Sequence, residues 1–390
     1  MSPRKISILG STGSIGRSTL DVVVRHPGEF DVVALAANSN VELLASQCRR
    51  FRPKYACLVD SSKVKELHSQ LGDQKVEVLA GSDELVKLAG MEDIDLVVNA
   101  VVGAAGLLAS LETVSNMDKS LALANKESLV AGGPLFPEIL KRTGSRILPI
   151  DSEHSALWQS LTSGKADEVR RLIITASGGP FRELPTNKFD SITPEQALEH
   201  PTWKMGPKIT IDSATLANKG LEVIEAVALF DMPVEKVSVV IHPQSIVHSM
   251  VEYVDSSIIA QLSNPDMRLP ITYALFWPNR VQSEFGQLDL NKLSSFTFEP
   301  PNFQKFSALR LAFEVAKSGG TAPAVFNAAN EVAVEAFLGG SIKFTGITDI
   351  IYRAVEKIDF ISSPDLKDIL KADSQARELA RQTVEKLKCL

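Results

Sequence analysis

The chain has 390 residues, which is too long for one ordinary hydrophobic core, so two or three domains are expected. Hydrophobic residues make up 44% and charged residues 23%, proportions that are typical of a soluble globular protein. The formal net charge of −6 argues against a broad nucleic-acid-binding surface, because such surfaces carry a basic excess. Any phosphate bound by this chain should therefore be small and locally held.

Neither a membrane nor an oxidising compartment is indicated. No run of about eighteen apolar residues occurs, which predicts that no segment spans a membrane. The segment "MSPRK" leads almost directly into a strand, so we expect no targeting peptide. Cys48, Cys57 and Cys389 form neither a metal-ligand spacing nor a disulfide framework. These features predict a reducing, cytoplasmic location.

Short apolar segments alternate with helical patterns over residues 1–150. Segments that are apolar throughout are typical of a parallel sheet with helices on both faces. The predicted strands are 5–10, 30–37, 55–59, 95–101, 120–125 and 146–150. This alternation predicts an α/β, Rossmann-like nucleotide-binding architecture.

The stretch "ILGSTGSIG" places Gly10, Gly13 and Gly16 between the first strand and the first helix. Glycines in this position let the backbone approach a pyrophosphate, which the helix N-terminus attracts. The spacing is G-x-x-G-x-x-G rather than the usual G-x-G-x-x-G, and a glycine-rich turn without a chemical role is the alternative. Context favours the nucleotide-binding interpretation.

The end of the second strand, "LAANSN" (35–40), bears on the choice of nucleotide. NAD-binding proteins usually place an acidic residue there to bind the ribose hydroxyls, and such a residue is missing here. A 2′-phosphate would meet no repulsion, so NADP is favoured over NAD. These six residues contain no Arg or Lys, however, and the positive partner of the phosphate is not located.

Two carboxylates lie close together in "LPIDSEHS" (148–155). If the chain is extended over 149–153, Asp151 and Glu153 point to the same side and can hold one ion. If a helix begins at Asp151, the two side chains diverge and form only a cap with an acidic first turn.

From about residue 151 the pattern changes to strands with alternating polar residues, at 170–176, 237–243, 246–254 and 257–262. Such strands predict a mixed sheet with one face packed against helices. The Gly-, Pro- and Asn-rich segment 177–210 is typical of a functional loop. After about residue 290 the sequence predicts a linker followed by helices.

The segment 212–230, read as one helix, supplies a third carboxylate. Asn218, Lys219 and Glu222 then share one face, although a surface Lys–Glu pair is the alternative. Gly220 costs roughly 1 kcal/mol relative to Ala, which predicts a close approach at this point. Three carboxylates without clustered His or Cys favour Mg²⁺ or Mn²⁺ over zinc.

Several longer motifs resemble one known family. They are "ILGSTGSIG", "ALANKESLV", "DSEHSA", "SGGPFR", "HPTWKMG", "NKGLE", "IHPQSIVHSM" and "NAANEVAVEAFL". From residue 5 to about 385 the chain resembles the 1-deoxy-D-xylulose 5-phosphate reductoisomerases. The resemblance implies NADPH- and divalent-metal-dependent rearrangement and reduction of 1-deoxy-D-xylulose 5-phosphate to 2-C-methyl-D-erythritol 4-phosphate, in the non-mevalonate isoprenoid pathway.

The resemblance also implies a homodimer and a domain plan. An NADPH-binding domain spans 1–150, a catalytic domain with a mixed sheet spans 151–290, a linker spans 291–310 and a C-terminal helical domain spans 311–390. A flap at about 177–208 would close Trp203 and Met205 over the substrate and exclude water.

Residue roles follow from the resemblance position by position. The metal ligands would be Asp151, Glu153 and Glu222, and Lys126 would stabilise negative charge that develops on the substrate. With this ligand set we expect residues 151–153 to be extended, so that the carboxylates of Asp151 and Glu153 both face Glu222. The remaining substrate-binding set is Ser152, Ser177, His200, Trp203, Met205, Ser213, Asn218 and Lys219. The cofactor-binding set is Thr12, Gly13, Ser14, Ile15, Asn38, Ser39, Asn40, Asn125, Glu127 and Gly206.

Three histidines and one serine are singled out in addition. Many members of the family carry a basic residue where Ser39 stands. His154 is expected to take no part in the chemistry. His242 and His248 lie in predicted strands and are expected to be structural, with His248 the candidate for supporting the metal site from behind.

Two other functions are compatible with parts of the sequence. One is an NADP-dependent dehydrogenase of a hydroxy acid or semialdehyde, which needs no metal. The other is a redox-sensing protein that changes partners with NADP(H). The convergence of three carboxylates argues against the dehydrogenase. A large fall in turnover with cofactor binding preserved, in Asp151→Ala or Glu222→Gln, would rule out the redox-sensing protein.

Overall fold

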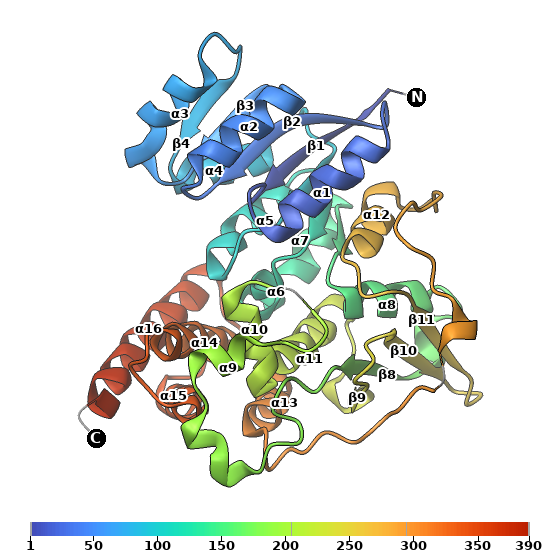
Figure 1. Cartoon of the computed structure of the whole chain (residues 1–390), viewed down its shortest axis with the longest axis vertical. Helices are drawn as coiled ribbons and strands as arrows, with labels where there is room; N and C mark the ends of the chain where they lie inside the picture. Colours follow the sequence, from blue (N-terminus) through green and yellow to red (C-terminus); the bar gives the residue numbers. More distant parts are fainter. Residues whose placement is uncertain (1, 204, 294, 389–390) are drawn as a thin grey trace. The chain divides into compact units, whose positions relative to one another are not determined.

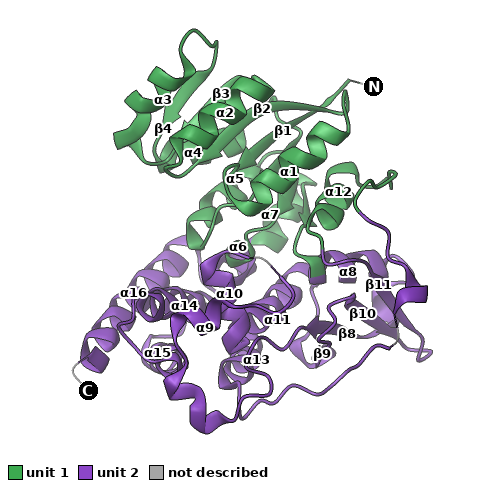
Figure 2. Cartoon of the chain, in the orientation of Figure 1, with its two compact units in different colours: residues 1–128, 136–152, 266–285 green, residues 129–135, 153–265, 286–390 purple. Residues whose placement is uncertain are grey.

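The computed structural model describes residues 2–203, 205–293 and 295–388, so Cys389 lies outside the described residues. The chain forms two compact units (Figure 2). Unit 1 comprises residues 1–128, 136–152 and 266–285, and unit 2 comprises 129–135, 153–265 and 286–390. The segment 266–285 thus folds with the N-terminal residues, and the division of unit 2 into a catalytic and a helical domain stays a prediction.

Unit 1 is built on a seven-stranded parallel sheet in the order β4-β3-β2-β1-β5-β6-β7. Figure 1 labels the first four strands of this order. The strands are β1 (Arg4–Leu9), β2 (Phe30–Ala37), β3 (Tyr55–Leu58), β4 (Glu77–Ala80), β5 (Leu96–Asn99), β6 (Ser120–Leu123) and β7 (Arg146–Pro149). Six of them were predicted, because their apolar side chains are buried on both faces of the sheet. The strand β4 was not predicted, because it is a half-exposed edge strand and lacks the buried apolar run of the other strands.

The helices of unit 1 connect these strands. They are α1 (Ser14–Arg25), α2 (Val41–Phe51), α3 (Val64–Leu71), α4 (Ser82–Gly90), α5 (Leu107–Ser115), α7 (Phe136–Thr143) and α12 (Arg268–Phe276), with short 3₁₀ turns η1 (Ser61–Lys63) and η2 (Ala104–Gly106). The helix α6 (Lys126–Gly132) begins in unit 1. Because parallel strands need crossovers, the loops that follow the strands gather at one edge of the sheet.

Unit 2 contains a four-stranded mixed sheet in the order β11-β10-β8-β9, which confirms the predicted mixed sheet. Its strands are β8 (Val169–Ala176), β9 (Val237–Ile241), β10 (Val247–Tyr253) and β11 (Ile258–Leu262). The pair β8–β9 is parallel, whereas β10 runs antiparallel to β8 and to β11. The strand β11 therefore lies at an edge of this sheet.

The helices of unit 2 surround one large hydrophobic core. They are α8 (Ser152–Leu161), α9 (Pro194–Leu198), α10 (Pro207–Thr215), α11 (Ala217–Phe230), α13 (Ser307–Ser318), α14 (Ala322–Leu338), α15 (Phe344–Lys357) and α16 (Leu366–Lys388), with 3₁₀ turns η3 (Gly133–Leu135), η4 (Ala166–Glu168), η5 (Thr186–Ser191), η6 (Val234–Lys236) and η7 (Leu290–Lys292). Among the described residues, no helix combines the length and the apolar character that crossing a membrane requires.

The predicted single helix over 212–230 was wrong, because the chain breaks at Leu216 into α10 and α11. Leu216 adopts a left-handed conformation with φ 57°. A leucine rarely adopts this conformation, so the sequence pattern carried no signal for the break. The Thr215 hydroxyl accepts a hydrogen bond from the backbone N–H of Ala217 at 3.2 Å and supports the turn.

Candidate active site

The glycine loop lies between β1 and α1, at the point where the strand order of the sheet reverses. The strands β2, β3 and β4 lie on one side of β1, and β5, β6 and β7 lie on the other. Gly10 has φ +82°, and a side chain at Gly16 would clash with the backbone of Gly10 and Ser11. Ligands of such sheets bind at the carboxyl ends of the strands beside this reversal, and the free amides of α1 face that edge.

The predicted cofactor residues after β2 stand on the same edge. Asn40 precedes α2, and its side chain accepts a hydrogen bond from the Leu43 N–H at 3.1 Å. It therefore caps α2 and fixes where the loop 38–40 ends. Residues 35–40 contain neither a carboxylate nor a cationic side chain.

Asn125 organises the next part of the edge. Its side-chain amide donates hydrogen bonds to the carbonyls of Val101 and Gly103, each at 2.8 Å, and to the Glu127 carboxylate at 3.0 Å. Asn125 is buried, so these bonds hold the loop after β5 against the loop after β6. Lys126 begins α6 directly beside them.

Lys126 and Asp151 form an ion pair, with 2.7 Å between Nζ and Oδ2. The pairing follows from the sheet order, because β6 and β7 are neighbours and both residues come just after the ends of these strands. The side chain of Lys126 is buried. A buried cation beside a carboxylate can stabilise negative charge on a bound substrate.

The predicted extended conformation over 151–153 was wrong. The strand β7 ends at Pro149 and α8 begins at Ser152, so Asp151 stands immediately before a helix and Glu153 lies in its first turn. The two side chains nevertheless do not diverge. One oxygen each from Asp151, Glu153 and Glu222 lie within 4.8 Å of one another. The longer glutamate side chain reaches the aspartate despite the helical backbone.

Glu222 lies on α11 with the neighbours that its helical spacing predicted. Lys219 donates to Glu153 at 2.8 Å and also to Glu222, and the Asn218 amide donates to Glu222 at 2.5 Å. Lys219 is buried, which opposes its charge, but Glu153 and Glu222 outweigh burial and raise the pKa of Lys219. The alternative of a surface Lys–Glu pair does not apply, because Lys219 and Glu222 are both buried.

The close approach predicted at Gly220 is confirmed, and the neighbour is α13. A Cβ on Gly220 would lie 2.5 Å from the Cβ of Ala312. The backbone of α11 thus packs directly against a C-terminal helix. This contact fixes the position of α11 along its axis, and with it the positions of Lys219 and Glu222.

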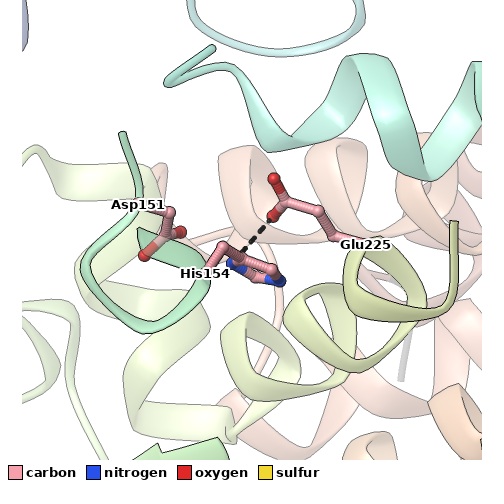
Figure 3. A group of neighbouring side chains, drawn as sticks. All are labelled: Asp151, His154 and Glu225. Carbon is pink, nitrogen blue, oxygen red and sulfur yellow. Dashed lines mark ion pairs between the residues drawn. The ribbon is translucent and has the colours of Figure 1, made fainter. Parts of the chain in front are cut away.

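His154 is fully buried, and its ring lies near Asp151 and points toward Glu225 (Figure 3). Its Nε2 lies 3.0 Å from the backbone carbonyl of Glu222, and its Nδ1 lies 3.5 Å from Glu225 Oε2. Asp151, His154 and Glu225 form a second group whose potential ligand atoms lie within 4.8 Å. The first group offers only carboxylate oxygens, which suits Mg²⁺ better than a group containing a histidine nitrogen.

Ser177, His200 and Ser213 meet in unit 2. His200 Nε2 lies 3.1 Å from both hydroxyls. His200 Nδ1 accepts hydrogen bonds from the backbone N–H groups of Thr202 and Trp203, so we assign the ring proton to Nε2. Burial lowers the pKa of His200, which favours this neutral ring. Two hydroxyls and an imidazole N–H therefore converge on one place.

The other flap residues stand beside this group. The Trp203 ring lies 6.2 Å from the ring of His248, which is buried in β10. Met205 is half-buried, and Gly206 caps α10. Burial lowers the pKa of His248. Trp203 thus lies beside His248, the histidine that was predicted to support the metal site.

His242 is structural, as expected. Its Nδ1 lies 3.0 Å from the carbonyl of Thr297, and its Nε2 accepts hydrogen bonds from the N–H groups of Ile246 and Val247 at 3.2 Å. The ring also stacks on Phe298, with 4.8 Å between centroids. His242 therefore fastens the segment after η7 to the β9–β10 turn.

A nucleotide-binding parallel sheet without an acidic residue after β2, together with an oxygen-only carboxylate group, defines an NADP-dependent, metal-using oxidoreductase. Sequence models of 1-deoxy-D-xylulose 5-phosphate reductoisomerase match residues 6–133, and models of the C-terminal domains of the same enzyme match residues 147–230 and 262–379. The chain belongs to the 1-deoxy-D-xylulose 5-phosphate reductoisomerase family and is an enzyme.

Curated relatives of that name cover almost the whole chain. One from Chlorobaculum tepidum is 51% identical over 381 residues, which are 98% of this chain and 100% of the relative. Another from Nitrosomonas eutropha is 49% identical over 389 residues, or 98% of this chain and 94% of the relative. These identities displace the metal-free dehydrogenase and the redox sensor as alternatives.

Solved structures agree in fold. The 1-deoxy-D-xylulose 5-phosphate reductoisomerase from Zymomonas mobilis, solved in complex with NADPH, is 45% identical with a TM-score of 0.91 and covers 99% of this chain and 100% of that one. A reductoisomerase solved with NADPH, fosmidomycin and magnesium is 38% identical with a TM-score of 0.94 and covers 99% of both chains.

Proposed function

We propose that this chain converts 1-deoxy-D-xylulose 5-phosphate to 2-C-methyl-D-erythritol 4-phosphate with NADPH and Mg²⁺ or Mn²⁺, in the non-mevalonate isoprenoid pathway. The convergence of Asp151, Glu153 and Glu222 is the observation that carries the proposal. Complexes of relatives with NADPH and magnesium support both cofactors. When bound, the divalent cation supplies Lewis acidity toward substrate oxygens.

The three carboxylates would hold that cation, and two lysines would neutralise the remaining charge. Lys126 is paired with Asp151, and Lys219 is paired with Glu153 and Glu222. Lys126 begins α6, where its ammonium group would stabilise negative charge that develops on the substrate. His154 would keep Glu222 in place through the backbone carbonyl of that residue.

The group around His200 would bind the substrate phosphate. The hydroxyls of Ser177 and Ser213 and the Nε2–H of His200 are three donors for phosphate oxygens. Asn218 and Lys219, in the first turn of α11, complete the proposed set, and Ser152 lies on the first turn of α8. Trp203 and Met205 would cover the bound substrate and exclude water from a reactive aldehyde.

The glycine loop and the loop after β2 would bind NADPH. The proposed residues share the carboxyl-end edge of the parallel sheet or flank Lys126, apart from Gly206 beside the flap. They are Thr12, Gly13, Ser14, Ile15, Asn38, Ser39, Asn40, Asn125, Glu127 and Gly206.

We also infer a homodimer and a reducing, cytoplasmic compartment. The exposed apolar edge of β11 supports the dimer. Cys48 and Cys57 are buried free cysteines, and burial raises the pKa of Cys48 to about 11 and of Cys57 to about 12. Protonated, buried thiols are inert, which suits a compartment without disulfide formation.

Replacing Glu222 with Gln tests the metal site, and Glu225→Gln is its matched control. Both glutamates are buried on α11, but only Glu222 belongs to the oxygen-only group. We expect Glu222→Gln to lower Mg²⁺-dependent turnover by about 100-fold or more and to weaken Mn²⁺ binding, because a charged ligand is lost. Glu225→Gln should have the smaller effect on both.

The assay is consumption of NADPH with 1-deoxy-D-xylulose 5-phosphate, combined with a Mn²⁺ titration followed by electron paramagnetic resonance. NADPH binding should be unchanged in both variants. Consumption of NADPH that does not depend on a metal, or a larger loss of Mn²⁺ affinity in Glu225→Gln, would contradict the proposed ligands.

A further inference from the structure

An NADP-binding site needs a cation for the 2′-phosphate near the end of the second strand. The segment 35–40 contains neither Arg nor Lys. The absence of a carboxylate removes repulsion but supplies no attraction. The cation must therefore come from a neighbouring segment of the sheet edge.

The neighbouring segment is the loop after β3, because β3 pairs with β2. Two backbone hydrogen bonds run between the two loops. The Val59 N–H donates to the Ala37 carbonyl at 3.0 Å, and the Asp60 N–H donates to the Asn38 carbonyl at 2.8 Å. These bonds extend the parallel ladder past the ends of the strands and fix the turn η1 beside residues 38–40.

Lys63, the last residue of η1, reaches the same loop with its side chain. Its Nζ donates to the backbone carbonyl of Ser39 at 3.4 Å. Lys63 is exposed, so its ammonium group is available to a ligand at Ser39. The carbonyl contact is long and costs little to exchange for a charged partner.

Asp60 is the anion on this turn, and its carboxylate is already engaged. It accepts hydrogen bonds from the Ser62 hydroxyl at 2.6 Å and from the Ser62 N–H at 3.1 Å. The hydroxyl bond, and to a lesser extent Lys63, lowers the pKa of Asp60. Asp60 therefore shapes η1 through its bonds to Ser62 and remains charged.

We propose that Lys63 is a specificity-determining residue that binds the 2′-phosphate of NADPH. Ser39 carries no positive charge, and Lys63, from the loop after β3, supplies one at the same place. An ammonium group on a flexible stem suits a phosphate dianion. The inference rests on the proposed cofactor site at residues 12–15 and 38–40.

The test is cofactor binding without substrate. Dissociation constants for NADPH and NADH are measured by calorimetry for the wild type, Lys63→Ala and Lys65→Ala. Lys65 is an exposed lysine in α3 and gives a matched change of charge. Lys63→Ala should weaken NADPH binding by about tenfold and leave NADH unchanged, since only NADPH carries the 2′-phosphate. Lys65→Ala should change neither by more than about twofold.

Two further variants separate the inference from the site on which it rests. Lys63→Ala combined with Ser39→Lys should restore the preference for NADPH, because it returns a cation to the same place. Ser39→Glu should weaken NADPH binding by repulsion. If Ser39→Glu weakens NADPH binding but Lys63→Ala does not, the role of Lys63 is wrong. If neither variant changes NADPH binding, the cofactor site is wrong as well.

Discussion

The buried histidine of β10 makes stability depend on pH. Burial lowers the pKa of His248 below its ordinary value of 6.5. The unfolded chain therefore takes up a proton below about pH 6.5 that the folded protein does not. The free energy of unfolding that the neutral His248 contributes is fully present above about pH 6.5. It is lost as the pH falls toward the lowered pKa of His248 in the folded protein. The pKa of His200 is also lowered by burial.

We expect His248→Gln to reduce this dependence. The melting temperature of the wild type should fall between about pH 7 and pH 5, and the fall should be smaller in the variant. Differential scanning fluorimetry at several pH values measures both slopes. His68→Gln, at an exposed position in α3, is the control and should keep the wild-type slope. Equal slopes in His248→Gln and the wild type would show that His248 does not carry the effect.

At the scale of elements, α14 holds α10 in place through one buried contact. Asn330 donates to Asp212 Oδ1 at 2.8 Å, and Lys208 lies 2.9 Å from Asp212 Oδ2. Ser213, the next residue, belongs to the proposed phosphate group. A shift of α10 would therefore move the Ser213 hydroxyl, a proposed donor to the substrate phosphate.

We expect Asn330→Ala to raise KM for 1-deoxy-D-xylulose 5-phosphate by about five- to tenfold, with a smaller effect on kcat, because it leaves a buried carboxylate oxygen without its donor. Asn327→Ala is the matched control. Asn327 is equally buried on α14, but its amide bonds to Glu331 of the same helix at 2.9 Å. Both variants should lose stability, and only Asn330→Ala should raise KM. Equal KM values in steady-state kinetics would argue against this role of α14.

Some of these elements could be predicted from the sequence, and others could not. The buried parallel strands were predicted because burial on both faces leaves a continuous apolar run. The break at Leu216 was missed, because leucine rarely adopts the left-handed conformation found there and the surrounding residues 212–219 contain no Gly or Pro to mark it. The shape of the chain at Asp151 was mispredicted for a related reason. Periodicity places side chains on faces, but it does not record how far a long side chain such as that of Glu153 reaches.

The predicted flap, at about 177–208, consists of parts with different packing. Phe181 and Phe189 belong to the core of unit 2, and each packs edge-on against Phe344 of α15. The described residues of 199–206 lie in no helix or strand. A lid motion would therefore be confined to this shorter segment, because moving the earlier part would expose aromatic core residues to water. The Gly-, Pro- and Asn-rich composition predicted a functional loop over the whole segment, and it did not distinguish the packed part around Phe181 and Phe189 from the part at 199–206.

At the scale of the whole molecule, the mixed sheet of unit 2 ends in an open edge at β11. Ile258 and Ile259 are 51% and 37% exposed. Successive residues of a strand point to opposite faces, so both faces of this edge are uncovered and apolar. Natural proteins protect such edges from uncontrolled pairing, and pairing with a second copy of the chain is one way to cover them.

We therefore expect the double variant Ile258→Lys, Ile259→Lys to shift the protein from dimer to monomer at micromolar concentration. Charged side chains on an edge strand oppose pairing, because association would bury them. Sedimentation equilibrium gives the mass of each species. Val254→Lys is the control, since Val254 is 64% exposed but lies in the turn before β11. A double variant with the wild-type dissociation constant would place the dimer interface elsewhere, and a wild type that sediments as a monomer would refute the dimer itself.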